Sequence, residues 1–168
     1  ATEGHCHEDK GAFILEAFGE SLFIDRGTPI YSDPTLELYK SARLHNLVTF
    51  ANSDGKEQRQ INPCPKEVIP SGRGDSKRLY LEVDTSPAWG EPLVKMIRKV
   101  DSPDPSFFMI TDDITLEKAE SVIFHLHSYY PVTVEGDSAE FLTPKTRLKV
   151  KWNWTGEVIS AEEELFDA

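Results

Sequence analysis

Short strand-like segments separated by turn signals fill the second half of this sequence and constrain its fold more than any other feature. In them, apolar and polar side chains alternate, or apolar side chains run together between clusters of Gly, Pro, Asp and Ser. The segments are 78–84, 94–100, 107–112, 119–128, 132–135, 139–143 and 146–152. With the strands of the first half they number about ten or more, at the spacing typical of sandwiches. The sequence therefore predicts an all-β antiparallel β-sandwich.

The first half of the chain predicts a hairpin and a third strand. Residues 12–18 are a β-type apolar run, residues 19–21 a turn, and residues 22–24 a returning strand that leads into Asp25. The third strand is expected over residues 44–50. The hairpin would return Asp25 to the level of the residues that precede it.

A long excursion is expected over residues 51–78, which hold much of the chain's Gly, Pro and charge, with at most a short strand around 67–69. Arg73, Lys77 and Arg78 form the densest local positive charge. Because a guanidinium group binds carboxylates through two parallel hydrogen bonds, Arg73 is a candidate for binding an acidic sugar. The alternative is that these cations belong to a solvated loop.

Composition restricts the class of protein. The 168 residues are one domain's worth of chain, so a single domain over residues 1–168 is expected. Twenty-nine acidic against 18 basic residues give a net charge of −11, which argues against a nucleic-acid partner. No apolar run is long enough to span a membrane, so no membrane partner is expected. Cys6 and Cys64 could form one bridge, or Cys6 could ligate a metal, but two cysteines make no disulfide framework.

Histidines near strand-like runs mark the candidate site. In an extended segment His5 and His7 would project from the same face, and His45 opens the third strand. Two imidazoles and the Asp25 carboxylate form a plausible zinc-ligand set. The alternative is that these histidines are ordinary surface or core residues, because a His-x-His pair alone is a weak signal.

A second His-x-His pair, His125 and His127, lies in the strand predicted over residues 119–128. Alternation places both imidazoles on the face opposite Phe124 and Leu126. We interpret them as a polar sheet face rather than as a rival metal site, because no Asp-x-Gly hairpin accompanies them.

The order of motifs over residues 4–50 resembles the β-sandwich domain of the heparinase II/III-like polysaccharide lyases, which include heparin, heparan sulfate and oligoalginate lyases. The matching motifs are Gly4-His5-Cys6-His7-Glu8-Asp9-Lys10-Gly11-Ala12-Phe13, Gly19-Glu20, Asp25-Arg26-Gly27, Tyr31 and His45-Asn46. Arg98-Lys99-Val100 and residues 108–113 resemble later strands of the family less distinctively.

This resemblance implies site residues and a cofactor. His7, Asp25 and His45 fall on positions that hold a structural Zn²⁺ in the family. His5 falls on a position that reaches the substrate cleft, where it would neutralise the uronate carboxylate or take part in proton transfer during β-elimination. Tyr31 either packs as an ordinary aromatic residue or lines the sugar cleft.

The resemblance also implies a longer protein. Family members carry an N-terminal α/α toroid that supplies the catalytic base and acid, and the chain opens directly on the motif. We therefore expect one domain of a periplasmic or secreted bacterial lyase, inactive alone, whose partners are the toroid and an acidic polysaccharide. Two alternatives are a non-catalytic carbohydrate-binding sandwich and a metal enzyme complete in this chain.

Overall fold

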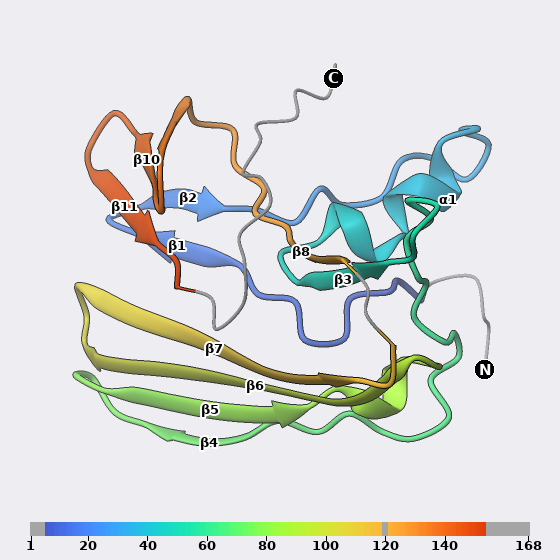
Figure 1. Ribbon diagram of the computed structural model, residues 1–168. Helices are drawn as coiled ribbons and strands as arrows, with labels where there is room; N and C mark the ends of the chain where they lie inside the picture. The colour runs from blue at the N-terminus through green and yellow to red at the C-terminus, as the bar shows by residue number, and fades with distance from the viewer. Residues whose placement is uncertain (1–5, 119–120, 154–168) are drawn as a thin grey trace. The chain divides into compact units, whose positions relative to one another are not determined.

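The computed structural model describes residues 6–118 and 121–153, which form eleven strands, all in antiparallel sheets. The prediction of an all-β antiparallel sandwich is confirmed (Figure 1). The chain groups into two compact units, which we call unit 1 and unit 2. Unit 1 takes in the chain up to Phe13 together with Asp25–Leu126, and unit 2 takes in Ile14–Ile24 and the chain from His127 onward.

The larger sheet of unit 1 has four strands in the order β4-β5-β6-β7. Their bounds are β4 Ser71–Gly74, β5 Leu79–Asp84, β6 Leu93–Asp104 and β7 Phe107–Leu116. Three of them lie where alternation predicts strands. β6 runs past the predicted segment because a register shift between Asp101 and Asp104 accommodates Pro103, which has no N–H for the ladder.

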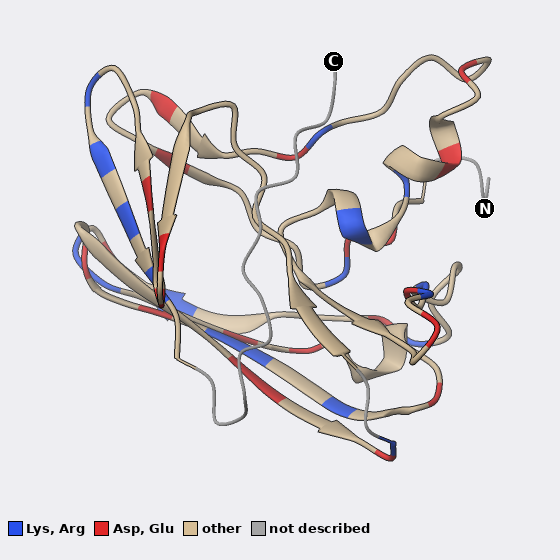
Figure 2. Ribbon diagram, turned by 45° about the horizontal axis from the view of Figure 1, so that its top comes forward, with Lys and Arg blue, Asp and Glu red and all other residues tan. Residues whose placement is uncertain are grey.

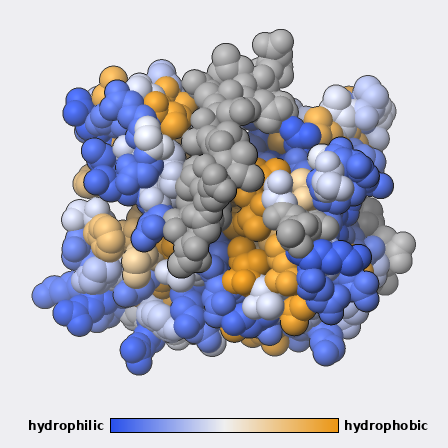
Figure 3. Space-filling model, viewed as in Figure 1, coloured by the Kyte–Doolittle hydropathy of each residue, from blue (hydrophilic) through white to orange (hydrophobic). Residues whose placement is uncertain are grey.

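A second layer of unit 1 pairs β3 (Val48–Ala51) with β8 (Ser121–Phe124). The core between the layers contains buried Phe50 and Met96, and the Phe50 ring meets the Trp89 ring edge-on at 5.1 Å between centroids. Trp89 follows a 3-10 turn, Ser86–Ala88. In Figure 3 hydrophobic residues gather at the level of β3 and β8, while most of the visible surface is hydrophilic.

Two predicted strands differ from the structure. The excursion over 51–78 contains β4 rather than a strand at 67–69, because close pairing with β5 depends on glycine: a Cβ on Gly72 would lie 2.4 Å from the carbonyl oxygen of Tyr80. The Ser-Gly-Arg-Gly sequence of β4 has no apolar alternation that would indicate a strand. The strand predicted over 119–128 ends at Phe124, before both histidines.

Unit 2 contains a hairpin and a three-stranded sheet in the order β11-β10-β9. The bounds are β1 Leu15–Ala17, β2 Glu20–Phe23, β9 Val132–Glu135, β10 Ser138–Leu142 and β11 Arg147–Lys151. The predicted hairpin is confirmed, but its turn is centred on Phe18 and Gly19, both with positive φ (56° and 73°), as a tight two-residue turn demands. Phe23 and Phe141 pack edge to face at 5.2 Å.

Candidate functional site

The three predicted metal ligands, His7, Asp25 and His45, come together in unit 1. Nδ1 of His45 lies 2.6 Å from Oδ2 of Asp25, and the His7 and His45 rings have centroids 5.3 Å apart at a tilt of 54°. Nε2 of His7 lies 2.7 Å from the Thr28 hydroxyl. Residues that are distant in the sequence thus form one cluster, which we call the His7–Asp25–His45 cluster.

The Asp25 carboxylate is fixed by the turn that follows it. Oδ1 accepts the backbone N–H of Gly27 at 2.8 Å, and Gly27 has a φ of 72°, which favours glycine. Burial raises the pKa of Asp25, but the bonds from Gly27 and His45 outweigh it and hold the pKa below 3.8. Asp25 is therefore an anion at neutral pH and favours the proton of His45 on Nδ1.

His45 has an unused nitrogen. It follows the 3-10 turn Ala42–Leu44 and is 1% exposed. Its Nε2 is buried and has no hydrogen-bond partner within the described ranges, 6–118 and 121–153. A buried polar atom without a hydrogen-bond partner lowers the stability of the fold by roughly 1–3 kcal/mol. We therefore expect a ligand or a metal to bind this nitrogen.

His7 lies on a segment that is held by side chains. Residues 6–13 form no strand. Buried Glu8 accepts the N–H of Ala42 at 3.2 Å and Nε of Arg59 at 2.5 Å. Burial, followed by the nearby His45, lowers the pKa of His7 from 6.5. The imidazole is therefore neutral at pH 7, the form that binds metals.

Arg98 is a site-supporting residue that the sequence reasoning missed. It is 2% exposed and binds Asp112 through two bonds of 2.7 and 2.8 Å. Its Nη1 also donates to the carbonyl oxygens of Gly11 at 2.7 Å and Asn46 at 3.2 Å. Arg98 therefore ties the segment of His7 to that of His45. The available signal was an arginine at an inward position of β6, opposite Asp112.

The chemistry of the cluster fits zinc, while its arrangement is that of a hydrogen-bonded group. Neutral imidazoles and an ionised carboxylate are zinc ligands. Among the residues that the structure describes, no three His, Cys, Asp or Glu side chains are arranged as a ligand set. Asp25 instead supports Nδ1 of His45 and leaves Nε2 open, as carboxylates do behind metal-binding imidazoles. Cys6 and Cys64 are free thiols, not a bridge.

The remaining predicted site residues are His5, Tyr31 and Arg73. His5 falls outside the described residues. Tyr31 is 62% exposed in the loop that follows Asp25, so it does not pack in the core. Arg73 lies on β4, the edge strand of the larger sheet, with its guanidinium 5.8 Å from the centre of the Tyr80 ring.

The second histidine pair does not form a shared polar sheet face, because β8 ends before it. Nε2 of His125 lies 2.7 Å from the Thr49 hydroxyl and 3.6 Å from Oε2 of Glu57. The contact with His125, opposed by burial, lowers the pKa of Glu57 from 4.5. His127 belongs to unit 2 and is 8% exposed.

Comparison with known proteins identifies the family. The family model described as Heparinase II/III-like, C-terminal, matches residues 1–167, so the resemblance read from residues 4–50 is confirmed and covers nearly the whole chain. No curated protein matches the chain. Within the described residues, no helix is long and apolar enough to cross a membrane.

Proposed function

Because the chain belongs to the Heparinase II/III-like, C-terminal family, we propose that it is the β-sandwich domain of a lyase that cleaves uronic-acid-containing glycans by β-elimination. The family match makes it a member of a polysaccharide lyase family. The substrate class, heparan or alginate type, is our proposal. So are the N-terminal α/α toroid as partner, a periplasmic or secreted location, and the inactivity of this domain alone.

A structural Zn²⁺ at the His7–Asp25–His45 cluster is part of the proposal. The observation that carries it is the buried, partnerless Nε2 of His45 beside a neutral imidazole and an ionised carboxylate. Bound zinc would fasten the segment of His7 to that of His45. Asp25 takes part either as a direct ligand or by orienting His45 through Nδ1.

His5 supplies the proposed chemical contribution of this domain. Elimination at a uronate requires removal of the proton on C5, which becomes acidic enough only when the neighbouring carboxylate is neutralised. His5 stands two positions before His7 in the sequence, so anchoring of His7 limits the reach of His5. We assign it to the substrate carboxylate, and we assign the base and the acid that protonates the departing O4 to the toroid.

The test uses the longer protein that we propose, with this domain joined to its toroid. His5→Ala should lower kcat on a uronate polymer by about 10²-fold, the range seen when one charge-stabilising group is lost. The ultraviolet absorbance of the unsaturated uronate product reports the reaction. Lys151→Ala, at an exposed position of β11, is the control and should retain wild-type kcat. Unchanged kcat in His5→Ala would refute the assigned role.

A non-catalytic carbohydrate-binding sandwich is the second candidate function. The stacking of Arg73 on Tyr80 favours it, because an aromatic ring beside a guanidinium group suits an acidic sugar. The two functions differ in one result. If the domain is a non-catalytic binding module, the joined protein will bind the polymer without forming unsaturated product.

A further inference from the structure

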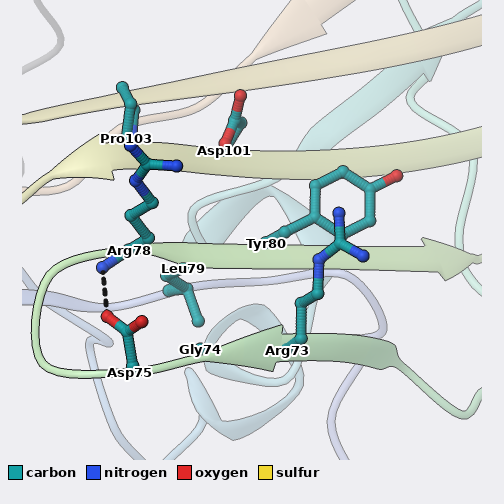
Figure 4. Close-up of a pocket in the computed structure, with 8 residues that line it drawn as sticks. All are labelled: Arg73, Gly74, Asp75, Arg78, Leu79, Tyr80, Asp101 and Pro103. Atoms are coloured by element: carbon teal, nitrogen blue, oxygen red, sulfur yellow. Dashed lines mark hydrogen bonds between the residues drawn. The ribbon is translucent and has the colours of Figure 1, made fainter.

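The hairpin of β4 and β5 carries a hollow that the catalytic proposal does not use. It has a volume of about 480 Å³, and its lining includes Arg73, Arg78, Tyr80 and Asp101. Figure 4 shows these side chains placed around it, Arg78 from the turn before β5 and the others from β4, β5 and β6. A second hollow of about 380 Å³ shares Arg73 and Tyr80 with it.

Within residues 6–118 and 121–153, the two arginines of the hollow have no carboxylate partner. Four other arginines, Arg43, Arg59, Arg98 and Arg147, each form an ion pair with Asp or Glu. Neither Arg73 nor Arg78 forms one within the described part of the chain.

The neighbouring carboxylate of Asp75 is engaged in the turn, where it accepts the backbone N–H groups of Lys77 and Arg78 at 2.7 and 3.0 Å. Elsewhere on this sheet, cations pair with acids: Lys95 binds Asp113 at 2.7 Å and Lys99 binds Glu82 at 3.4 Å. Figure 2 shows basic and acidic positions interspersed along the long strands. The lining of the hollow thus carries Asp75 and Asp101 as well as Arg73 and Arg78, but within the described residues neither guanidinium group is held in an ion pair, so both can bind an external carboxylate.

Strand register places these groups on one face. Arg73 lies opposite Tyr80 across the β4–β5 ladder, and Arg78 precedes Tyr80 by two positions, so all three side chains share a face. The Tyr80 hydroxyl donates to Oε2 of Glu82 at 2.8 Å, which orients the ring. The result is an aromatic surface with a guanidinium group 5.8 Å from its centre.

The groups around the hollow indicate the chemistry of the ligand. A guanidinium group matches a planar carboxylate with two parallel hydrogen bonds. An aromatic face packs against the apolar C–H face of a pyranose. Asp101, opposite Tyr80 on β6, offers carboxylate oxygens to sugar hydroxyl donors. The charges of Asp101 and Asp75 at the hollow disfavour a ligand that carries sulfate groups in addition to its carboxylate.

We propose that the β4–β5 hairpin is a second sugar-binding site for an unsulfated uronate residue of a polysaccharide, with Arg73 and Arg78 on the carboxylate and Tyr80 on the sugar ring. This inference rests on the proposed function for its ligand class. It adds a site that binds the polymer away from the His7–Asp25–His45 cluster and performs no chemistry.

The test is titration of the ¹⁵N-labelled 168-residue chain with a β-1,4-linked glucuronate hexasaccharide, followed by amide chemical shifts. Cellohexaose, the same backbone without carboxylates, is the matched neutral sugar. We expect saturable shifts over residues 71–82 with the glucuronate sugar alone. Equal shifts with cellohexaose, or none over these residues, would overturn the proposal.

Two variants separate the site from general charge. Arg73→Ala/Arg78→Ala should weaken binding by roughly tenfold or more, because it removes charge-assisted hydrogen bonds. Lys149→Ala/Lys151→Ala, on β11, removes the same charge and should leave the Kd within about twofold. Tyr80→Phe keeps the ring and should retain binding, whereas Tyr80→Ala should lose it. Equal weakening in both double variants would overturn the proposal, with circular dichroism confirming the fold of each.

The two proposals can fail separately. Shifts confined to the surroundings of His7 and His45 would refute the hairpin site and leave the lyase assignment standing. Binding at the hairpin, together with unchanged kcat in the His5→Ala lyase, would establish the site and refute the assigned role of His5.

Discussion

Replacing Arg98 should destabilise unit 1 far more than replacing an exposed cation on the same pair of strands. Arg98→Met leaves the Asp112 carboxylate, 9% exposed, without its partner and removes a donor from the carbonyl oxygens of Gly11 and Asn46. Loss of one member of a buried ion pair costs about 3–5 kcal/mol. The Arg98 guanidinium group also lies 5.2 Å from the centre of the Phe124 ring, and Arg98→Met removes that contact as well.

Lys95→Met is the matched control. Lys95 binds Asp113 at 2.7 Å on the same two strands, but these side chains are 40% and 54% exposed. Exposed pairs contribute about 0–1 kcal/mol, so a difference of at least 2 kcal/mol between the variants is expected. The comparison therefore contrasts a buried arginine that forms several hydrogen bonds with an exposed lysine that forms one ion pair on the same two strands.

Urea unfolding, followed by the fluorescence of buried Trp89, measures the free energy of unfolding of unit 1. Trp152 and Trp154 are replaced by Phe in every variant, so that Trp89 gives the whole tryptophan signal. The double variant Arg98→Met/Asp112→Leu should recover most of the loss, since no charge remains buried. Equal free energies of unfolding for Arg98→Met and Lys95→Met would refute the reasoning.

Two further predictions concern glycine and aspartate. Gly72→Ala should lower the free energy of unfolding by about 1–3 kcal/mol and speed amide hydrogen exchange over residues 71–82, because its Cβ would lie 2.4 Å from the Tyr80 carbonyl oxygen. The control is Gly90→Ala, whose Cβ would meet nothing within 4 Å and should leave the stability unchanged. Protection unchanged in Gly72→Ala would contradict this. Folding lowers the pKa of Asp25 from 3.8, so the unfolded chain binds this proton more readily than the folded chain does. The metal-free wild type should therefore lose stability as the pH falls below 3.8 and through the folded pKa. Asp25→Asn should flatten that acid limb, measured as Tm against pH, whereas the charge control Asp137→Asn should keep it.

The sequence predicted those parts of the fold that local pattern encodes. Alternation located β5, β6 and β7, and turn residues located the β1–β2 hairpin. Alternation did not locate β4, because Ser-Gly-Arg-Gly contains no alternating apolar residues. That strand is defined by its close pairing with β5, which a local pattern does not reveal. The predicted strand over residues 119–128 runs past the end of β8 at Phe124, because the alternation of apolar and polar residues continues beyond the ladder.

The residues of the site could be predicted from the sequence, but the contacts that hold them could not. The motif order named His7, Asp25 and His45, which the structure brings together. How His7 is held depends on bonds between residues 51 apart, Arg59 to Glu8, and 87 apart, Arg98 to Gly11. Spacing along one sequence carries no sign of such pairs, so the way in which this segment is held could not be predicted.

The measurement that tests the account most directly is elemental analysis of the purified chain, before and after chelation, in wild type and His45→Ala. We expect near one zinc per chain in wild type, removed by chelation and absent from His45→Ala, while Lys151→Ala retains it. Absence of zinc from wild type prepared with the metal in excess, or full retention in His45→Ala, would contradict the assignment of the buried Nε2 of His45 to zinc.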